Sequence, residues 1–479
     1  MNYRMIKNIT GWLLLFEAMF LLVPSVTALV YLEKAGLYYI GTALVCALIG
    51  WLLMRKKPAN TVLYAREGYI IVSLSWIVMS LCGAVPLCLC GDIPSYVDAV
   101  FEVASGFTTT GASILGEVES LAHASLMWRS FTHWVGGMGV LVFIMAFVPL
   151  SAAQNFHIMK AETPSPSVSK LVPRIKTTAL ILYTLYLGMT LLMFILLLCG
   201  GMSVFDSLNT AFATAGTGGF GFRNDSMGSF SPYIQIVITV FMLAFSLDFG
   251  CYYCILRGKP KDAFNAEIRT FLFIVFAAIA VITLNVRSMF DTTGDAIRHV
   301  SFTVGSLVST TGFSTVDFDQ WPVFSQTLLV LLMFIGGCSG STAGGMKVSR
   351  FIILFKGMVK ELDTLVHPHR VRKVTIDKRP VNPEVIRSVN AFVVCYLLVY
   401  VISLVLLSVA ETGNDLVTNF TAVAATINNI GPGLSLVGPT CNYGFFTVFS
   451  KIVLIFDMLA GRLAIFPMLV LLTPSTWKK

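Results

Sequence analysis

Long apolar stretches alternate with short polar ones along most of this chain. Ten of them are long enough to cross about 30 Å of hydrocarbon as helices. They are residues 10–32, 36–54, 69–90, 127–150, 174–199, 232–256, 268–290, 322–346, 386–410 and 443–472. The pattern predicts an all-α polytopic membrane protein with ten transmembrane helices. Glu17 interrupts the first stretch and no small-residue cleavage site follows it, so we expect a retained helix rather than a signal peptide.

Four short polar stretches that end in glycine each lie between two apolar segments. They are Thr108–Gly111, Gly216–Gly219, Ser309–Gly312 and Asn428–Gly431. Polar, helix-breaking backbone at membrane depth is tolerated only where protein buries it or where it lines a watery path. After two leading helices the chain therefore repeats one unit four times: helix, outer segment, glycine element, helix. Each unit crosses the membrane twice, so we predict four re-entrant pore loops in parallel, pseudo-fourfold helix–pore loop–helix repeats.

These repeats divide the chain into an accessory part, four pore repeats and one basic cytoplasmic loop. We assign the two accessory helices to residues 1–66 and the loop to residues 361–385. The pore repeats are residues 67–150, 151–265, 266–360 and 386–479. The third of them is expected to have a broken second helix.

Each outer segment is expected to contain a short helix that ends at the glycine element. Asp98 and Asp206 lie at equal spacing before their glycines, with Thr418 at that place in the fourth unit and His299 in the third. Asp and Thr suit a helix N-cap because their oxygens accept free first-turn N–H groups. Such a helix points its carbonyl end, with about half a negative charge, toward the glycine element.

A ring of backbone carbonyls at the ends of four such helices is one way to build a cation filter. The expected filter residues come from all four elements, with three from each. They are Thr109, Thr110, Gly111, Thr217, Gly218, Gly219, Thr310, Thr311, Gly312, Asn429, Ile430 and Gly431. The fourth element, with its two asparagines and Pro432, departs most from the others, so the ring is unequal.

Composition and charge placement agree with a membrane protein. The chain is 56% hydrophobic and only 12% charged, where about a quarter of residues are charged in soluble domains. The net charge of +8 is concentrated in alternate loops, which by the positive-inside rule places both termini in the cytoplasm and the glycine elements outside. The basic excess therefore reflects topology and not nucleic-acid binding. We expect Lys347–Arg387 to be a solvated loop, with a docking surface for a cytoplasmic partner as the alternative.

The eighth apolar stretch is interrupted by a run of small residues. Glycine costs a helix about 1 kcal/mol relative to alanine, so this helix is expected to break and line a cavity. A small-residue packing seam is the alternative. The candidate gate residues are Gly336, Gly337, Ser339, Gly340, Ser341, Thr342, Gly344, Gly345 and Lys347. We expect Lys347 to snorkel to the inner surface.

The remaining candidates are ionisable or thiol side chains within apolar stretches. Arg462 lies in the last stretch, where an unpaired charge usually marks a pathway. Asp457 lies seven residues before Ala464 and shares nearly one helix face with it. Glu17 and Asp248 are the other acids, and we assign neither a role. The ten cysteines have no metal-ligand spacing, so we expect structural thiols.

Several motifs together indicate a family. They are Ser105–Ala112, His133–Gly139, Ser309–Phe313, Gly336–Lys347, Asn428–Gly433 and Gly461–Leu463. With them the chain resembles, over essentially its whole length, the superfamily of Trk, Ktr and HKT cation transporters. The resemblance is greatest to the membrane-embedded Trk-H type subunit of bacterial potassium uptake.

The resemblance implies a role for several of these residues. It places a gate loop just below the filter, and Arg462 in the pore beneath it as an electrostatic barrier. The family usually has a glutamate where this chain has Ala464. Our hypothesis is that Asp457 partly supplies the missing charge, whereas an aspartate without a role is the alternative. Plant relatives selective for sodium have serine at the position of Gly111, so the resemblance implies potassium.

The expected function is potassium uptake through a channel-like pore in the bacterial inner membrane. The resemblance implies a homodimer with a cytoplasmic nucleotide-binding regulatory subunit. No nucleotide-binding motif occurs in this chain, so a nucleotide would act only through that partner. Potassium is the substrate, no covalently bound cofactor is expected, and membrane lipid surrounds the protein. A proton- or sodium-coupled symporter using Glu17, Asp248 or Asp457 is the alternative. An enzyme is not expected, because the six histidines are dispersed without plausible catalytic partners.

Overall fold

The computed structural model describes residues 1–479 except 57–62, 140–174, 370–372, 378 and 478–479. Within the described part, six helices are long and apolar enough to cross a membrane, or seven if one sharply bent pair counts as a single span. These six agree with the first two predicted stretches and with the first helix of each repeat. Among the described residues, unbroken helices do not reach the predicted count of ten, because the second helices of the second, third and fourth repeats end or break partway.

The accessory part is a hairpin of two spans. The first consists of α1 (Tyr3–Phe20) and α2 (Leu22–Val30), and the second is α3 (Ala35–Met54). The spans cross closely at two glycines, since a Cβ added to Gly11 would lie 2.8 Å from the carbonyl oxygen of Gly50. Small residues at such crossings let helix backbones approach one another.

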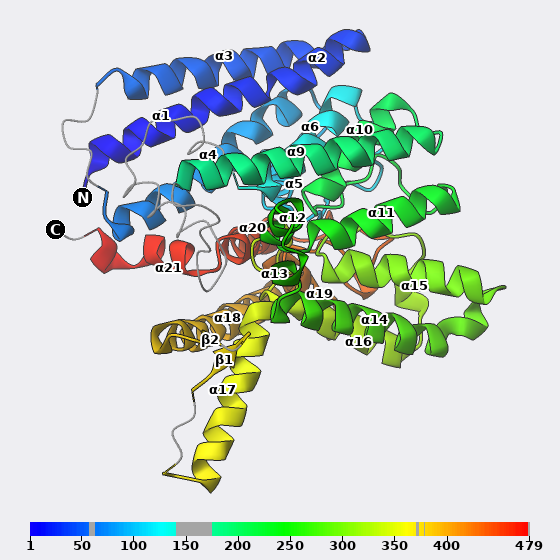
Figure 1. The fold of residues 1–479 in the computed structure, drawn as a ribbon. Helices are drawn as coiled ribbons and strands as arrows, with labels where there is room; N and C mark the ends of the chain where they lie inside the picture. Colours follow the sequence, from blue (N-terminus) through cyan, green and yellow to red (C-terminus); the bar gives the residue numbers. More distant parts are fainter. Residues whose placement is uncertain (57–62, 140–174, 370–372, 378, 478–479) are drawn as a thin grey trace.

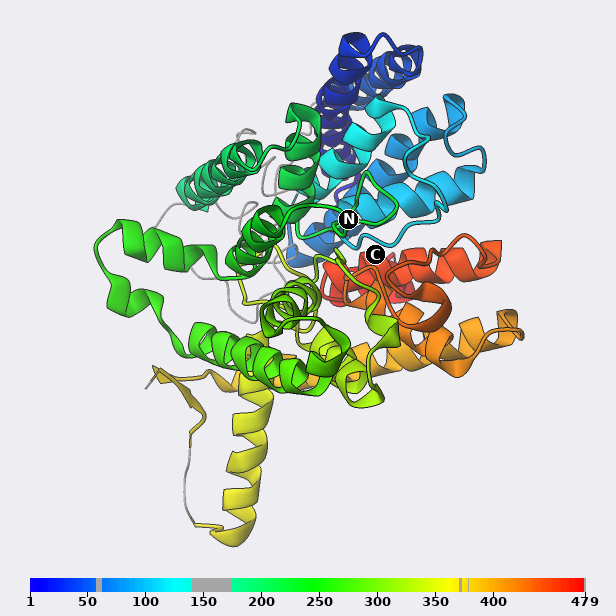
Figure 2. The ribbon, with the colours of Figure 1, turned by 90° about the vertical axis from the view of Figure 1, so that its right-hand side faces the viewer.

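In each of the four predicted repeats, a long helix is followed by a short helix, which we call the pore helix. The long helices are α4 (Ala65–Leu89), α9 (Ile175–Cys199), α14 (Ala266–Val286) and α18 (Pro383–Ala410). The pore helices are α5 (Tyr96–Phe107), α10 (Val204–Ala215), α15 (Thr293–Val308) and α19 (Leu416–Ile427). Viewed from the right-hand side of Figure 1, the differently coloured repeats surround a common centre in chain order (Figure 2).

The second helices are α6, α11 with α12, α16, and α20 with α21. Their bounds are α6 (His123–Gly137), α11 (Pro232–Phe245), α12 (Phe249–Leu256), α16 (Val323–Ile335), α20 (Val448–Arg462) and α21 (Phe466–Leu472). The axis turns by 92° between α11 and α12. Only the third repeat was expected to break here, so the breaks in the second and fourth repeats are additions to the prediction. The expected continuation of the first repeat's second helix, residues 140–150, lies outside the described residues.

The segment Lys347–Arg387, expected to be a solvated loop, contains a helix and two short strands. α17 (Val348–Val366) projects from the helical body in both views (Figures 1 and 2). It is followed by an antiparallel pair of two-residue strands, β1 (Thr375–Ile376) and β2 (Arg379–Pro380). The predicted all-α fold with a basic loop at 361–385 did not include this strand pair or the end of α17. The charged residues of α17, which favour a loop in the sequence, lie on a helix in the structure. Short elements complete the fold: α13 (Pro260–Ala263), η1 (Arg287–Met289), η2 (Phe318–Gln320), η3 (Ser435–Val437) and η4 (Pro474–Thr476).

The pore helices begin three residues earlier than expected in the first, second and fourth repeats. Side chains of the residues that cap them accept first-turn N–H groups, and these N-caps are Ser95, Ser203, Thr292 and Asp415. Asp98, Asp206 and Thr418, predicted as caps, are instead the residues whose N–H groups are accepted. Both sets contain good capping residue types, so type alone could not choose between them. At the exposed start of α15, the Thr292 hydroxyl donates to Asp295 at 2.7 Å and holds the pKa of that carboxyl below its usual range.

Candidate functional site

The four glycine elements share one backbone conformation. Two residues of each element have positive φ, namely Thr109 and Gly111, Thr217 and Gly219, Thr310 and Gly312, and Asn429 and Gly431. The N–H of the residue between each pair donates to a carbonyl five residues back in the pore helix, at 2.8 or 2.9 Å. These bonds are Thr110 to Ser105, Gly218 to Ala213, Thr311 to Ser306 and Ile430 to Ala425. This is the Schellman arrangement of a helix C-terminus, and it fixes one register in all four elements.

Three of the four elements place threonine in a conformation that usually requires glycine. Thr109, Thr217 and Thr310 have φ of 55°, 54° and 58°. A β-branched residue is an outlier in this region, and such strain of about 1–3 kcal/mol tends to persist at functional sites. The threonine side chains make unequal contacts. Thr310 Oγ1 accepts from the Gly344 N–H at 2.6 Å, Thr217 Oγ1 donates to Gly216 O at 2.6 Å, and Thr109 Oγ1 is buried without a partner among the described residues.

The glycines close the four elements into a ring. Each glycine faces the carbonyl that precedes the glycine of the next repeat, and the fourth faces the first. An added Cβ would lie very close to the facing carbonyl oxygen. The distances are 1.9 Å from Gly111 to Gly218 O, 1.9 Å from Gly219 to Thr311 O, 2.1 Å from Gly312 to Ile430 O and 2.8 Å from Gly431 to Thr110 O. A side chain at any of the first three glycines would therefore displace a neighbouring carbonyl. The ring is dense backbone in which carbonyls from all four repeats come together.

A cavity of about 130 Å³ lies against this ring. Its lining includes all four of the ring glycines, Gly111, Gly219, Gly312 and Gly431. The other lining residues include the loops that follow the first and fourth elements, with Cys441 and Asn442. A polar-lined depression therefore opens onto the ring.

A buried ion pair joins the first and second elements. Arg129 Nε of α6 donates to Glu102 Oε1 of α5 at 2.8 Å, and both side chains are buried. The guanidinium also donates to Gly221 O at 3.1 Å and lies over the Phe220 ring, 4.2 Å from its centroid. Glu102 in turn accepts from the Ile114 N–H at 3.0 Å. The Glu102–Arg129 pair therefore connects the segment after the first glycine element, at Ile114, with the segment after the second, at Gly221.

Removing one member of this pair should be strongly destabilising. We expect Glu102→Gln to lower the stability of the folded protein by about 3–5 kcal/mol, because it leaves the Arg129 charge buried without its partner. The measurement is the thermal unfolding midpoint in detergent. The double variant Glu102→Gln/Arg129→Met should recover a large part of the loss, since no unpaired charge remains. A double variant less stable than Glu102→Gln alone would contradict this reading.

His133 holds the second element against the first pore helix. Its Nε2 accepts from the Phe220 N–H at 3.2 Å and its Nδ1 lies 2.9 Å from Gly106 O. Because Nε2 is the acceptor, Nδ1 carries the proton and donates to that carbonyl. An added Cβ on Gly218 would lie 2.1 Å from His133 Nδ1, so the second glycine element packs directly against the His133 side chain of α6.

The candidate gate loop, residues 336–347, lies directly against the third and fourth elements. Gly344 donates its N–H to Thr310, and an added Cβ at Gly344 would lie 2.5 Å from Asn428 O. The loop also joins the break between α11 and α12, where the Cys338 N–H donates to Ser246 O at 2.9 Å. The described structure therefore brings most of the predicted gate residues into one folded loop beneath the ring.

Lys347 does not snorkel, which corrects the expectation from the sequence. Its side chain is fully buried, and its Nζ donates to Ala343 O at 2.7 Å and Cys338 O at 3.3 Å. Nζ also lies 3.5 Å from Ser341 O. The broken helix leaves carbonyls without helical partners, and these carbonyls offer the ammonium a nearer partner than the membrane surface. Lys347 is thus an internal cation that organises the loop.

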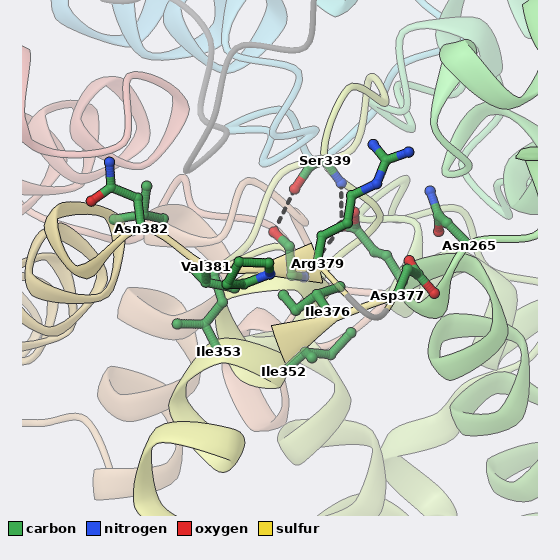
Figure 3. A pocket seen from close by; sticks show the side chains of 13 residues that line it. Asn265, Ser339, Ile352, Ile353, Ile376, Asp377, Arg379, Val381 and Asn382 are labelled. Carbon is green, nitrogen blue, oxygen red and sulfur yellow. Dashed lines mark hydrogen bonds between the residues drawn. The ribbon is translucent and has the colours of Figure 1, made fainter. Parts of the chain in front are cut away.

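The lower side of the loop borders a second cavity, of about 400 Å³. Ser339 of the loop lines it together with Asp377 and Arg379 of the hairpin segment (Figure 3). The Ser339 N–H donates to Glu267 Oε1 at 2.6 Å. The gate loop is therefore in contact with α14 and lies beside the hairpin that follows α17.

Arg462 connects three repeats beneath the ring. Its Nη1 donates to Thr342 O of the gate loop at 2.8 Å. Its Nη2 donates to Gly136 O and Gly137 O at the end of α6, at 2.6 and 2.7 Å. A fixed fork of donors suits such multiple carbonyl contacts. A positive charge is therefore held at the level where the second helices break.

The structure does not bring Asp457 to Arg462. Asp457 is fully buried, and its Oδ1 accepts from Ser403 Oγ of α18 at 2.7 Å. Among the ion pairs of the described residues, none joins Asp457 to Arg462. After Arg462 the helix is interrupted at Ala464 and Ile465, which have φ of 53° and 66°. This break ends the shared helix face on which the hypothesis of a replacement charge depended.

Comparisons with known proteins agree with this architecture. Residues 38–479 match the model of a family described as TrkH, cation transport protein. The Trk system potassium uptake protein TrkH of Escherichia coli strain K12 is 36% identical over 490 residues, covering 100% of both chains. TrkG of the same strain is 32% identical over 487 residues, covering 100% of this chain and 99% of that one. The crystal structure of the potassium transporter TrkH from Vibrio parahaemolyticus superposes with a TM-score of 0.89, at 34% identity and 100% coverage of both chains.

Proposed function

Because the chain belongs to the TrkH family of cation transport proteins, which are potassium transporters and not enzymes, we propose that it takes up potassium through the carbonyl ring. The observation that carries the proposal is the closure of the ring. Gly111, Gly219, Gly312 and Gly431 each face the carbonyl of the next repeat. Four pore helices point their carbonyl ends at this ring, which favours a cation. Carbonyl oxygens at such a site replace the hydration shell of a potassium ion.

The barrier beneath the ring is the gate loop together with Arg462. Gly344 ties the loop to Thr310 of the ring, and Arg462 ties Thr342 of the loop to α6. A potassium ion leaving the ring meets a guanidinium and a loop folded around the Lys347 ammonium. Opening the path requires the loop to leave these contacts. This is our proposed gate.

We also propose the membrane setting and the partners. The chain lies in the bacterial inner membrane with the ring on the outer side, and the two termini lie at one end of the helical body (Figure 1). The basic, projecting α17 and its hairpin are then cytoplasmic. They are placed to meet a nucleotide-binding regulatory subunit beside the gate loop. The functional unit is a homodimer.

A potassium symporter driven by protons or sodium is the competing mechanism. Two of its three candidate acids are hydrogen-bonded away from the ring. Asp248 Oδ1 accepts from the Gly250 N–H at the start of α12, and Asp457 is bonded to Ser403. Glu17 lies in the accessory helix α1. None of the three is bonded to a ring residue in the described part of the chain, so passive flow is the mechanism we propose.

The test is electrical. The purified protein in liposomes should pass a current that reverses at the Nernst potential of potassium, whatever the imposed pH or sodium gradient. A reversal potential that moves with the pH gradient would establish proton coupling and contradict passive flow. Asp457→Asn and Asp248→Asn should leave the reversal potential unchanged.

The outer position of the ring can be tested with a native thiol. Cys441 lines the cavity against the ring and is exposed. A membrane-impermeant, positively charged methanethiosulfonate reagent added outside should reduce potassium flux by at least severalfold, because it places a cation at the mouth. Cys441→Ser should abolish the effect. Cys199, exposed at the end of α9 away from this cavity, is the matched control, and Cys199→Ser should leave inhibition intact. Equal inhibition of the Cys441→Ser variant would contradict the placement.

A further inference from the structure

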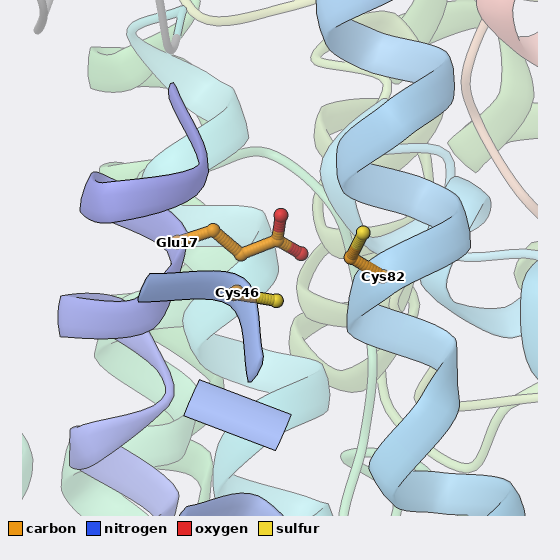
Figure 4. Close-up of side chains that lie close together, drawn as sticks. All are labelled: Glu17, Cys46 and Cys82. Atoms are coloured by element: carbon orange, nitrogen blue, oxygen red, sulfur yellow. The ribbon is translucent and has the colours of Figure 1, made fainter. Parts of the chain in front are cut away.

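A carboxyl and two thiols meet where the accessory helices pack against the first repeat. The ligand atoms of Glu17 of α1, Cys46 of α3 and Cys82 of α4 lie within 4.8 Å of one another. Figure 4 shows Glu17 pointing toward Cys82 on the facing helix, with Cys46 beside them. Both carboxylate oxygens of Glu17 are buried and have no hydrogen-bond partner among the described residues. A buried carboxylate is costly unless it is hydrogen-bonded, paired or bound to a metal.

Close helix packing builds this cluster. Gly11 and Gly50 let α1 approach α3, and Gly83, next to Cys82, leaves room for the Glu17 carboxyl beside Val103 and Trp128. An added Cβ at Gly83 would lie 3.3 Å from Glu17 Oε1. The three side chains are therefore held by three helices, and a ligand there would connect all of them.

We propose that Glu17, Cys46 and Cys82 bind a divalent, thiol-preferring metal ion such as Zn²⁺. Cysteine sulfur binds zinc at about 2.3 Å and carboxylate oxygen at about 2.0–2.2 Å, in tetrahedral geometry. Two sulfurs on such an ion lie roughly 3.8 Å apart, and the ligand atoms of the cluster lie within 4.8 Å of one another. Thiolate ligands select soft or borderline ions over hard ones. The site is thereby distinct in chemistry from the carbonyl ring, and it does not depend on which ion the pore conducts.

Charge and proton balance favour a divalent ion. Binding forms two metal–sulfur bonds and one metal–oxygen bond, and the protons of both thiols and of the carboxyl leave to solvent. No electron is transferred. The three ligands together carry three negative charges. With a divalent ion the net charge of the site is therefore −1. One coordination position stays open for a further ligand.

Metal binding would tie the accessory hairpin to the first repeat. The ion binds the folded protein through three helices, so it should stabilise the fold by mass action. We expect Zn²⁺ to raise the thermal unfolding midpoint of the wild-type protein after treatment with a chelator. Cys46→Ser should lose this increase.

The direct test uses Cd²⁺ as the probe, because its bonds to thiolates give an ultraviolet charge-transfer band. The chelator-treated wild-type protein in detergent should develop this band with one equivalent of Cd²⁺, and Zn²⁺ should remove it by competition. Cys46→Ser and Cys82→Ser should abolish the band, and Glu17→Gln should weaken binding at least tenfold. Cys88→Ser, which removes another partly buried thiol of α4, is the matched control and should bind as wild type does. A wild-type protein without the band, or a band that survives in both serine variants, would overturn the proposal.

A second measurement needs no variant. Mass spectrometry after alkylation of the wild-type protein gives the reactivity of each cysteine separately. Zn²⁺ should slow alkylation of Cys46 and Cys82 at least tenfold and leave Cys88 and Cys395 unchanged. Equal protection of all four thiols, or none at Cys46 and Cys82, would contradict the site even where a serine variant does not fold.

Discussion

Gly111→Ser should reduce the preference for potassium over sodium at least tenfold. A Cβ at this position would lie 1.9 Å from Gly218 O, and Gly111 has a φ of +79°. A side chain in that conformation costs roughly 1–2 kcal/mol, and the contact forces the Gly218 carbonyl out of the ring. A tenfold change in the relative affinity for potassium and sodium corresponds to about 1.4 kcal/mol. The energy of this displacement is of that size, so it is large enough to change the selectivity tenfold. The measurement is the reversal potential under mixed potassium and sodium gradients.

Gly116→Ser is the control for this substitution. Gly116 follows the same element, but the nearest atom to an added Cβ there is Asn442 Nδ2 at 3.6 Å, an ordinary contact. It should keep wild-type selectivity. A folded Gly111→Ser protein with unchanged selectivity would show that the Gly111–Gly218 contact does not shape the ion path.

Arg462→Ala should raise potassium flux on the order of tenfold, the change that follows from a barrier lower by about 1.4 kcal/mol. Two effects act in the same direction. The substitution removes a positive charge beneath the ring, and it removes the hydrogen bonds that hold Thr342 to Gly136 and Gly137. The gate loop then loses this connection to the first repeat. Single-turnover or steady flux of potassium or rubidium into liposomes measures the effect.

Arg462→Lys separates the two effects. Lysine keeps the charge but lacks the planar fork that reaches three carbonyls at once. If the charge forms the barrier, the lysine variant should conduct much less than the alanine variant. If the hydrogen bonds hold the gate, both variants should conduct alike. A folded Arg462→Ala protein with flux equal to or below wild type would contradict both roles.

The repeat pattern and the register of the glycine elements could be predicted because they depend on local chemistry. Polar residues followed by glycine stand out between apolar helices. The same pair of positive φ values then recurs at Thr109 and Gly111 and at their equivalents. The pore-helix starts were misplaced by three residues, because Ser95 and Asp98 are both suitable caps. Sequence alone does not reveal which of two suitable N-cap residues begins the helix.

The features that were missed depend on contacts between segments far apart in the sequence. The break at Ala464 and Ile465 has no run of glycines, and its one sequence signal is Pro467 in the first turn of α21. Lys347 was expected at the membrane surface because the carbonyls that bind it become free only when the loop folds. The sequence contains one signal for the Arg129–Glu102 pair, since both charged residues lie in otherwise apolar or small-residue segments. The Glu17 cluster left none, because its three members come from three helices.

The central claim is that the ring of carbonyls binds the conducted ion, and anomalous scattering tests it most directly. Crystals grown with rubidium or thallium in place of potassium locate the ion without any assumption about transport. We expect an anomalous peak at the centre of the ring, within coordination distance of the carbonyl oxygens of Thr110, Gly218, Thr311 and Ile430. A folded protein that conducts rubidium or thallium but shows peaks only away from this ring would contradict the account.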